Sequence, residues 1–400
     1  MIQAFASKYI FDGVSLLENA MVIVESDDNH ANSGGCNYGH DYAGSVCVIK
    51  DVVAANSSTK DVYNGIPVTN FGDGVITPGF IDLQVNGCGG VLFNDNIAHD
   101  TLETIYQTWL KFGTTSFMPT LITCDFEDVI KALEVVRSWF GKFGNNRGVI
   151  GVHLEGPFIS KTKRGIHPEQ FIIPPTMDLL EQIAAYAKLF PIKMTVATEQ
   201  FTLEQIKFLV DEQIIVSVGH SNAAYENVLQ GIKTGITTAT HVFNAMSGLT
   251  GRHPGVIGAV LNTDIYAGVI ADGLHVDNAN IAILNKIKPR QTYLITDAVT
   301  PTGTNLSQFE LCGQTLYVKD GKCLNEDGVL GGAYLTMNGA VKHCVQNCGV
   351  DLANALAMAS TIPASVMKLD DVLGKIRPGY RADLVYLDLN DFKCKLCMQQ

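Results

Sequence analysis

The chain has 400 residues, and 46% of them are apolar, which is enough for one large domain with a substantial core and a smaller domain beside it. Its 28 lysines and arginines stand against 40 aspartates and glutamates, so the formal net charge is −12. This excess of negative charge argues against a surface for nucleic acid or anionic membranes, and an anionic ligand would need a local cationic pocket.

The sequence contains no recognisable targeting or membrane segment. No apolar run reaches the roughly 20 residues that a membrane span needs, and residues 1–8 lack the basic-then-apolar order of a secretory signal. The ten cysteines are mostly scattered, and the pair Cys394 and Cys397 has no second pair to complete a zinc site. We therefore expect a protein of the reducing cytoplasm, with neither a membrane nor a nucleic-acid partner.

The two ends of the chain read as short strands joined by turns. Strand patterns in the first 76 residues lie near 3–6, 20–24 and 46–49. The same pattern returns at 383–387, near the C-terminus. We expect residues 1–76 and 374–400 to form one small β-sandwich domain.

A polar segment interrupts the N-terminal strands. Residues 27–44 are rich in Asp, Asn, Gly and Ser and contain His30 and His40. These two histidines could bind a metal ion, but nothing in the sequence fixes their geometry. We interpret the segment as a solvated loop.

From residue 75 the pattern changes to alternating strands and helices, which predicts a parallel sheet. Strands are predicted near residues 76–85, 115–119, 149–154, 193–196, 214–218, 238–240, 266–270 and 292–295. Helices are predicted between most of them, near residues 101–111, 126–140, 177–188, 202–210, 222–234 and 279–287. Eight such strands fit a (β/α)8 TIM-like barrel over residues 77–373, an α/β fold whose active site lies at the C-terminal strand ends. A doubly wound open sheet is the alternative, but chemical residues end too many strands for one crevice.

After Pro301 the pattern becomes hairpin-like, with a strand pattern at 316–318 and turns at Gly321 and at 325–328. Helical patterns follow at 336–347, 352–360 and 363–368.

Chemically versatile side chains stand at the ends of the predicted barrel strands. The first strand ends with Gln84 and Asn86, and the third with His153 and Glu155; alternate residues of a strand share one face. The later strands end with or lead to His220, His241, Asp272, His275 and Asp297. A carboxylate and two imidazoles form a common catalytic zinc set that leaves one position open for water.

Each of these residues alone has a structural explanation. A single histidine at a strand end is more often a hydrogen-bonded structural residue than a ligand. Glu155 precedes Gly156-Pro157 and could cap a turn, and Asp297 could cap a helix. The joint pattern favours a site, because an apolar barrel mouth would not gather so many polar groups without a partner.

Six motifs occur in a fixed order between about residues 75 and 340: Pro78-Gly79-Phe80-Ile81-Asp82-Leu83-Gln84-Val85-Asn86-Gly87, His153-Leu154-Glu155-Gly156-Pro157-Phe158, Gly219-His220-Ser221, Thr240-His241-Val242-Phe243-Asn244-Ala245-Met246, Ala271-Asp272-Gly273-Leu274-His275 and Thr296-Asp297-Ala298. In these motifs the chain resembles the N-acetylglucosamine-6-phosphate deacetylases of the amidohydrolase superfamily. Gln84 and Asn86 stand where the wider superfamily usually has His-x-His. That substitution is typical of many of these deacetylases and implies one tightly held metal ion rather than two.

The resemblance implies a role for each residue of the reacting centre. Glu155, His220 and His241 would ligate one divalent metal ion per subunit, Zn²⁺ first and Fe²⁺ or another divalent ion as alternatives. Asp297 would be the general base and then the general acid. His167 would stabilise the oxyanion with the metal, although it could instead be a histidine that grips the substrate.

The resemblance also implies the residues that bind the phosphosugar. These residues are Gln84, Asn86, Asn244, Ala245, Arg252 and His275. Arg252 lies in a turn-like segment that, in this family, reaches the neighbouring subunit's site, so a homodimer is expected. From the sequence alone, Arg252 reads as a solvated surface charge.

The activity implied is hydrolysis of the N-acetyl amide of N-acetylglucosamine 6-phosphate, in amino-sugar breakdown. Deacetylation of the galactosamine epimer is an alternative that the sequence does not separate. A barrel that has lost catalysis and serves as a scaffold would be expected to lack some of Glu155, His220, His241 and Asp297, and all four are present. Two departures from the family, the long polar segment 27–44 and the short tail ending at Gln400, affect only the small domain.

Overall fold

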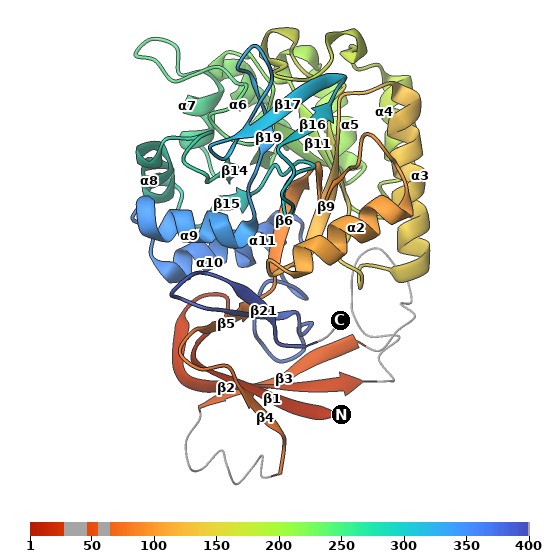
Figure 1. The fold of residues 1–400 in the computed structure, drawn as a ribbon. Helices are drawn as coiled ribbons and strands as arrows, with labels where there is room; N and C mark the ends of the chain where they lie inside the picture. The colour runs from red at the N-terminus through yellow and green to blue at the C-terminus, as the bar shows by residue number, and fades with distance from the viewer. Residues whose placement is uncertain (28–45, 55–64, 399–400) are drawn as a thin grey trace.

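The computed structural model describes residues 1–27, 46–54 and 65–398. A barrel forms the middle of the molecule, with a small sheet domain at one end and a short antiparallel sheet at the other (Figure 1). His30 and His40 lie outside the described residues, so the alternative of a metal site there stays untested. Among the residues that the structure describes, no helix has both the length and the apolar character of a membrane span.

The barrel is one sheet of eight parallel strands in chain order, from β6 to β15. Its strands are β6 (Phe80–Val85), β9 (Thr114–Ile122), β10 (Val152–Glu155), β11 (Ile192–Val196), β12 (Ile215–Val218), β13 (Thr238–Ala239), β14 (Tyr266–Ile270) and β15 (Thr292–Ile295). Its first and last strands meet where Asp297 N donates to Gln84 O at 3.0 Å and Val85 bridges Ala298. The prediction of a (β/α)8 barrel is therefore confirmed, and the open sheet was the wrong alternative.

Helices cover the outside of the barrel, as Figure 1 shows. They are α2 (His99–Leu110), α3 (Phe126–Phe143), α4 (Met177–Ala184), α5 (Leu203–Asp211), α6 (Tyr225–Thr234), α7 (Gly255–Leu261), α8 (Asn278–Ile287), α9 (Met337–Asn347), α10 (Leu352–Ala359) and α11 (Thr361–Val366). The sequence pattern finds the amphipathic ones, such as α3, whose buried residues recur every three or four positions. It did not indicate α7, because six of its seven residues are buried and no polar face marks the helical period.

The predicted strand at residues 76–85 is corrected by the structure into two strands. β5 (Val75–Pro78) belongs to the small sheet and β6 to the barrel, and Gly79 separates them. A side chain at Gly79 would lie 2.0 Å from Thr115 Oγ1, so only glycine lets the chain cross so close to β9. One apolar run therefore serves both sheets, which periodicity alone could not reveal.

The small domain is built from both ends of the chain, as predicted. Its strands are β1 (Ile2–Phe11), β2 (Leu16–Asp27), β3 (Val46–Ala54), β4 (Val68–Asn70), β5, β20 (Leu384–Leu387) and β21 (Cys394–Leu396). All seven belong to one continuous hydrogen-bonded sheet, in which β20 pairs with β5. Cys394 and Cys397 are free thiols whose pKa values are raised by burial, which makes them poor nucleophiles.

A four-stranded antiparallel sheet follows the barrel and covers its C-terminal end; we call it the flap. It consists of β16 (Gln308–Leu311), β17 (Gln314–Lys319), β18 (Lys322–Leu324) and β19 (Leu330–Ala333). Ala333 N donates to Asp297 O at 2.9 Å, so the flap is attached to the end of the eighth strand. Its apolar side chains pack on Leu92, Ile122 and Ile166. Two short strands, β7 (Gly87–Cys88) and β8 (Val91–Leu92), pair beside the first barrel strand.

A buried aspartate fixes the join between the first and last barrel strands. Asp82 is 0% exposed, and its Oδ2 accepts from Thr296 Oγ1 at 2.6 Å. Its Oδ1 accepts from the N–H groups of Gln84 and Thr296, both at 3.2 Å. Burial raises the pKa of Asp82 to about 7, although these hydrogen bonds oppose the shift.

This shift predicts how the stability of the barrel depends on pH. The pKa of Asp82 is higher in the folded chain than in the unfolded one, so its stabilising contribution is full at low pH and is lost as pH rises through about 7. Between pH 5 and 8 the loss is on the order of 2 kcal/mol. Asp82→Asn does not titrate, so the wild type should lose melting temperature relative to this variant over that range, as calorimetry would measure. A difference in melting temperature between the two proteins that stays constant from pH 5 to 8 would contradict the raised pKa of Asp82. Asp211→Asn, which changes an exposed aspartate, is the control.

Candidate metal centre and active site

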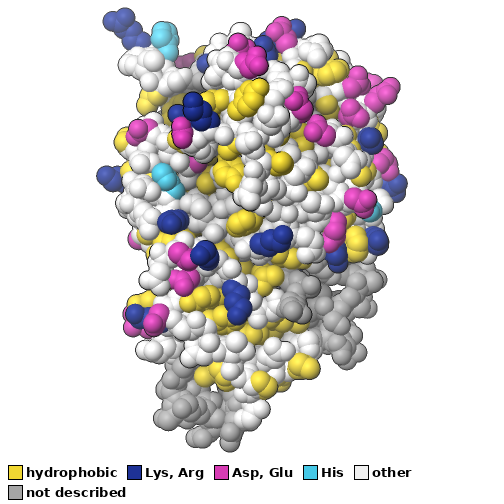
Figure 2. Space-filling view, in the orientation of Figure 1, with side chains coloured by type: hydrophobic (Ala, Val, Ile, Leu, Met, Phe, Trp, Pro, Cys, Tyr) yellow, Lys and Arg dark blue, Asp and Glu magenta, His cyan; other side chains and the backbone are white. Residues whose placement is uncertain are grey.

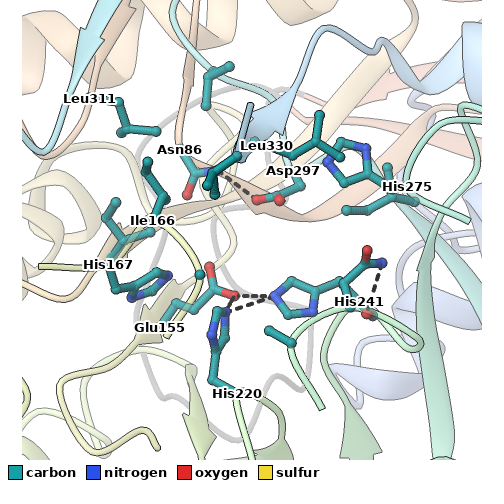
Figure 3. Close-up of a pocket in the computed structure, with 18 residues that line it drawn as sticks. Asn86, Glu155, Ile166, His167, His220, His241, His275, Asp297, Leu311 and Leu330 are labelled. Carbon is teal, nitrogen blue, oxygen red and sulfur yellow. Dashed lines mark hydrogen bonds and ion pairs between the residues drawn. The ribbon is translucent and has the colours of Figure 1, made fainter. Parts of the chain in front are cut away.

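The polar residues at the barrel-strand ends gather around one cavity of about 240 Å³ between the barrel mouth and the flap (Figure 3). The predicted site residues that line it are Asn86, Glu155, His167, His220, His241, Asn244, Ala245, His275 and Asp297. Gln84 lies directly behind the lining, and Arg252 is exposed on the loop before α7. The structure thus brings together all but one of the predicted residues.

The chain bends sharply where it delivers these side chains. Backbone φ is positive at His220 (46°), His241 (27°), Ala245 (50°) and Asp297 (52°). Non-glycine residues rarely adopt this conformation, and they persist in it only where the surrounding structure enforces it, often at functional sites. His220, His241 and Asp297 each stand two residues after a barrel strand ends, and these turns direct them into the cavity.

Glu155, His220 and His241 converge on one point. The Nε2 atoms of His220 and His241 lie 3.3 and 2.8 Å from Glu155 Oε1, and 3.0 Å from each other. Figure 3 shows the three side chains, from three different strands, turned toward one another. All three are at least 95% buried.

The hydrogen bonding of His220 shows why this arrangement fits a metal ion. His220 Nδ1 faces the carbonyl oxygen of Lys163 at 2.7 Å, and a carbonyl can only accept, so Nδ1 carries the proton. In the neutral ring Nε2 then points a lone pair at the Glu155 carboxylate, a repulsive contact unless a cation lies between them. Ligand atoms about 2.0 Å from a tetrahedral ion would be about 3.3 Å apart, close to the separations found here.

Charge also favours a cation at this point. Burial alone would raise the pKa of Glu155, but the adjacent imidazole rings of His220 and His241 hold that pKa well below its ordinary range. For His241, burial lowers the pKa, and the neighbouring Glu155 carboxylate reverses the shift to a net increase. His241 Nδ1 is buried and has no hydrogen-bond partner in the described part of the chain.

A second set of possible ligands, Glu155, His167 and His220, also lies within 4.8 Å. The Thr123 hydroxyl lies 2.8 Å from His167 Nδ1, and the Thr123 N–H donates to that nitrogen at 3.4 Å. A backbone N–H can only donate, so Nδ1 is the acceptor and Nε2 carries the proton. Burial, and then the nearby His220, lower the pKa of His167 to about 3, so the ring is neutral. His167 therefore suits a hydrogen-bond donor better than a ligand.

Asp297 lies beside this cluster, held by two amides. Its Oδ1 accepts from Asn86 Nδ2 at 2.7 Å and from Gln84 Nε2 at 3.0 Å. Burial, and then the negative charge of Glu155, raise the pKa of Asp297. A carboxylate with a raised pKa binds a proton more strongly than an ordinary one, which suits a group that must accept a proton and then donate it.

Beside Asp297 lies a second pair of ionisable groups, His275 and Asp272 (Figure 3). His275 Nδ1 lies 2.7 Å from Asp272 Oδ2, and Asp272 Oδ1 accepts from the N–H groups of Leu274 and His275. These contacts hold the His275 ring against the cavity wall. Burial opposes ionisation of Asp272, but its bonds to His275 lower its pKa overall.

His153, which follows the same strand pattern, is separate from this site. It is fully buried inside the barrel and does not line the cavity. Its Nε2 lies 2.7 Å from Thr195 Oγ1, and its Nδ1 lies 3.2 Å from Thr120 Oγ1. For this histidine the structural explanation is the correct one.

The sequence analysis missed two parts of the site. Thr123, just after the second strand, would have been found had threonine been counted among the strand-end residues. The apolar lining from the flap, Leu311, Val329 and Leu330, has no local signal, because it depends on how a distant sheet folds back.

Comparison with known proteins agrees with this geometry. The sequence profile described as "Amidohydrolase family" matches residues 75–399. N-acetylglucosamine-6-phosphate deacetylase of Haemophilus influenzae is 37% identical over 348 residues, which are 86% of this chain and 91% of that protein. N-acetylgalactosamine-6-phosphate deacetylase of a Shewanella species is 35% identical over 349 residues, 86% of each chain. The crystal structure of N-acetylglucosamine-6-phosphate deacetylase from Pasteurella multocida superposes with a TM-score of 0.89 at 37% identity, covering 98% of this chain and 97% of that one.

The family profile spans most of the chain, from β5 to the C-terminal strands, and so includes the whole barrel with its strand-end residues. Relatives more than 30% identical match over most of their own length as well. The chain belongs to the amidohydrolase family.

Proposed function

We propose that this chain is a metal-dependent deacetylase that hydrolyses the N-acetyl amide of N-acetylglucosamine 6-phosphate to glucosamine 6-phosphate and acetate. The observation that carries the proposal is the convergence of Glu155, His220 and His241 beside the buried Asp297. The relatives from Haemophilus and Pasteurella, which bear this name, support the choice of substrate.

Glu155, His220 and His241 would hold one divalent metal ion per subunit. Two imidazoles and a carboxylate suit Zn²⁺ best, and Fe²⁺ or another divalent ion would fit the same donors. When bound, such an ion lowers the pKa of a water molecule to near 7 and polarises the amide carbonyl.

Asp297 and His167 would carry the proton and the charge. Asp297 takes a proton from the attacking water and returns it to the departing amine, which its raised pKa favours. His167 Nε2–H donates a hydrogen bond to the carbonyl oxygen as that oxygen becomes an oxyanion. Burial under the flap excludes bulk water and strengthens both effects.

A phosphate group needs cationic or N–H donors to bind it. No lysine or arginine is among the described residues that line the cavity. We propose that Asn244, the backbone of Ala245 and His275 bind the phosphosugar, and that Arg252 of a second copy completes the phosphate site in a homodimer. The exposure of Arg252 on a loop that projects from the barrel supports this reach (Figure 1).

We further propose a cytoplasmic enzyme with two domains, residues 1–76 with 374–400 and residues 77–373. Lysine, arginine, aspartate and glutamate side chains are mixed on the face shown in Figure 2 rather than separated by sign, which suits a partner bound in a cavity rather than on a charged surface.

A second candidate substrate is the galactosamine epimer. The relative from Shewanella that bears this name matches the chain nearly as well as the glucosamine relative does. An acetate-release assay on both phosphosugars, with metal content measured on the same preparation, tests the function and separates the epimers. Absence of acetate from both substrates with metal present would overturn the proposal.

Asp297→Asn tests the proton carrier. The amide keeps the shape of the side chain but cannot accept the proton, so we expect kcat to fall by about 1000-fold or more. Metal content should stay at the wild-type level, as elemental analysis would show. Asp211→Asn, on the surface of α5, serves as the matched control and should keep full activity. An active Asp297→Asn enzyme would exclude Asp297 as the base.

His220→Ala tests the metal site. Loss of one of three protein ligands should leave the purified chain with far less than one bound ion, measured by elemental analysis, and should abolish turnover. His253→Ala removes an exposed histidine and should retain wild-type metal content. A fully loaded His220→Ala protein would mean that the ion lies elsewhere.

Arg252→Ala tests the shared phosphate site. We expect KM for the phosphosugar to rise by about tenfold or more, because a charge-assisted contact is lost, while hydrolysis of unphosphorylated N-acetylglucosamine stays unchanged. Arg290→Ala is the control for loss of an exposed arginine. Equal effects on the two substrates would remove Arg252 from phosphate binding.

A further inference from the structure

We propose that Gln84 and Asn86 are positioning residues that anchor one oxygen of Asp297 and thereby set the other as the proton acceptor. This inference rests on the proposed function and changes the role of two residues that the sequence resemblance assigned to substrate binding. It follows from three features: the hydrogen bonds to Asp297, the bridge from Gln84 to Glu155, and the join between the first and last barrel strands.

The two carboxylate oxygens of Asp297 have different surroundings. Oδ1 receives both amide donors, from Asn86 at 2.7 Å and from Gln84 at 3.0 Å. No donor among the described residues reaches Oδ2, and Asp297 lines the cavity. Two donors on one oxygen oppose rotation about the Cβ–Cγ bond, so Oδ2 stays toward the cavity, where the water and the leaving amine would be.

Gln84 also separates Asp297 from the other buried carboxylate. The same Nε2 lies 3.1 and 3.0 Å from the two oxygens of Glu155. An amide nitrogen carries two hydrogens, so one is available for each carboxylate. A single donor group thus offsets the repulsion between two buried acids and fixes their separation.

The amides cannot reverse their orientation without losing these bonds. A flipped Gln84 or Asn86 would point its carbonyl oxygen at a carboxylate, which is repulsive. In the orientation found, both carbonyl oxygens are buried and have no hydrogen-bond partner among the described residues. The carboxylates therefore dictate the orientation, even though it leaves two acceptors unsatisfied.

The backbone holds these residues in the same register. Asp297 N donates to Gln84 O, and Asn86 N donates to Ala298 O, each at 3.0 Å. Gln84 is 0% exposed and does not line the cavity, so it acts on the reaction through Asp297 and Glu155 rather than by touching substrate. Asn86 lines the cavity, although its carbonyl oxygen is buried.

Gln84→Leu tests the proposal, because leucine removes both donors while keeping a similar volume. We expect kcat to fall by about 100-fold, with KM within threefold of the wild type and one metal ion still bound. In an Asp297→Asn background the same substitution should change kcat by less than threefold, because its effect passes through Asp297. Gln205→Leu, in the capping box of α5, controls for loss of a glutamine far from the site.

Gln84→Asn is a second variant with a smaller risk to folding. It keeps the amide but shortens the side chain by one methylene, so the donor withdraws from Asp297. Its crystal structure should show the Asp297 carboxylate rotated away from the wild-type orientation, with kcat reduced by about tenfold or more and KM unchanged.

Four results would overturn the inference. A rise in KM with kcat intact would make Gln84 a substrate-binding residue. A Gln84 variant that loses its metal ion but regains normal kcat when the ion is added back would limit the role of Gln84 to holding Glu155. Wild-type activity in both Gln84 variants, or an unmoved Asp297 in the crystal structure, would leave Gln84 without this role. Inactive wild-type protein on both phosphosugars would instead overturn the proposed function, while the crystal structure would still test the anchoring.

Discussion

The site depends on keeping two buried carboxylates, Glu155 and Asp297, close together but in different states. Burial favours the neutral form of both acids. For Glu155 the adjacent imidazoles outweigh burial and keep it ionised, ready to bind a cation. Asp297 has only amide donors on its oxygen, and the charge of Glu155 adds to the effect of burial, so its pKa rises. The surroundings therefore shift the pKa values of these two acids in opposite directions.

The barrel and the flap together place Glu155 and Asp297 in the same cavity. The parallel barrel delivers each side chain from a separate strand, and positive-φ turns immediately after the strands aim them inward. The flap covers one side of the cavity with apolar side chains, which lowers the polarity around the charged groups inside it. The backbone carbonyl of Asp297 accepts a hydrogen bond from Ala333 N, which attaches the flap directly to Asp297.

Much of this arrangement could be predicted from the sequence. Runs of β-branched residues predict the barrel strands, and the last residues of parallel strands lie at the same edge of the barrel. The strand-end rule found Glu155, His220, His241 and Asp297 on local evidence. It also included His153, since alternation along a strand does not tell the barrel interior from its mouth. Three features were not predicted, because each depends on contacts between distant segments: the division at Gly79, the buried helix α7 and the apolar lining from the flap. The bridge from Gln84 to both carboxylates is of the same kind.

The closure of the barrel affects how its side chains come together during folding. Strands follow one another around the barrel in chain order, so Glu155, His220 and His241 come from strands that all precede β14 and β15. Asp297 joins only when the eighth strand docks on the first, a contact between Gln84 and a residue 213 positions away. Contacts of such long range form late and slowly. Closure of the barrel is therefore the step that brings Asp297 to the side chains of Glu155, His220 and His241.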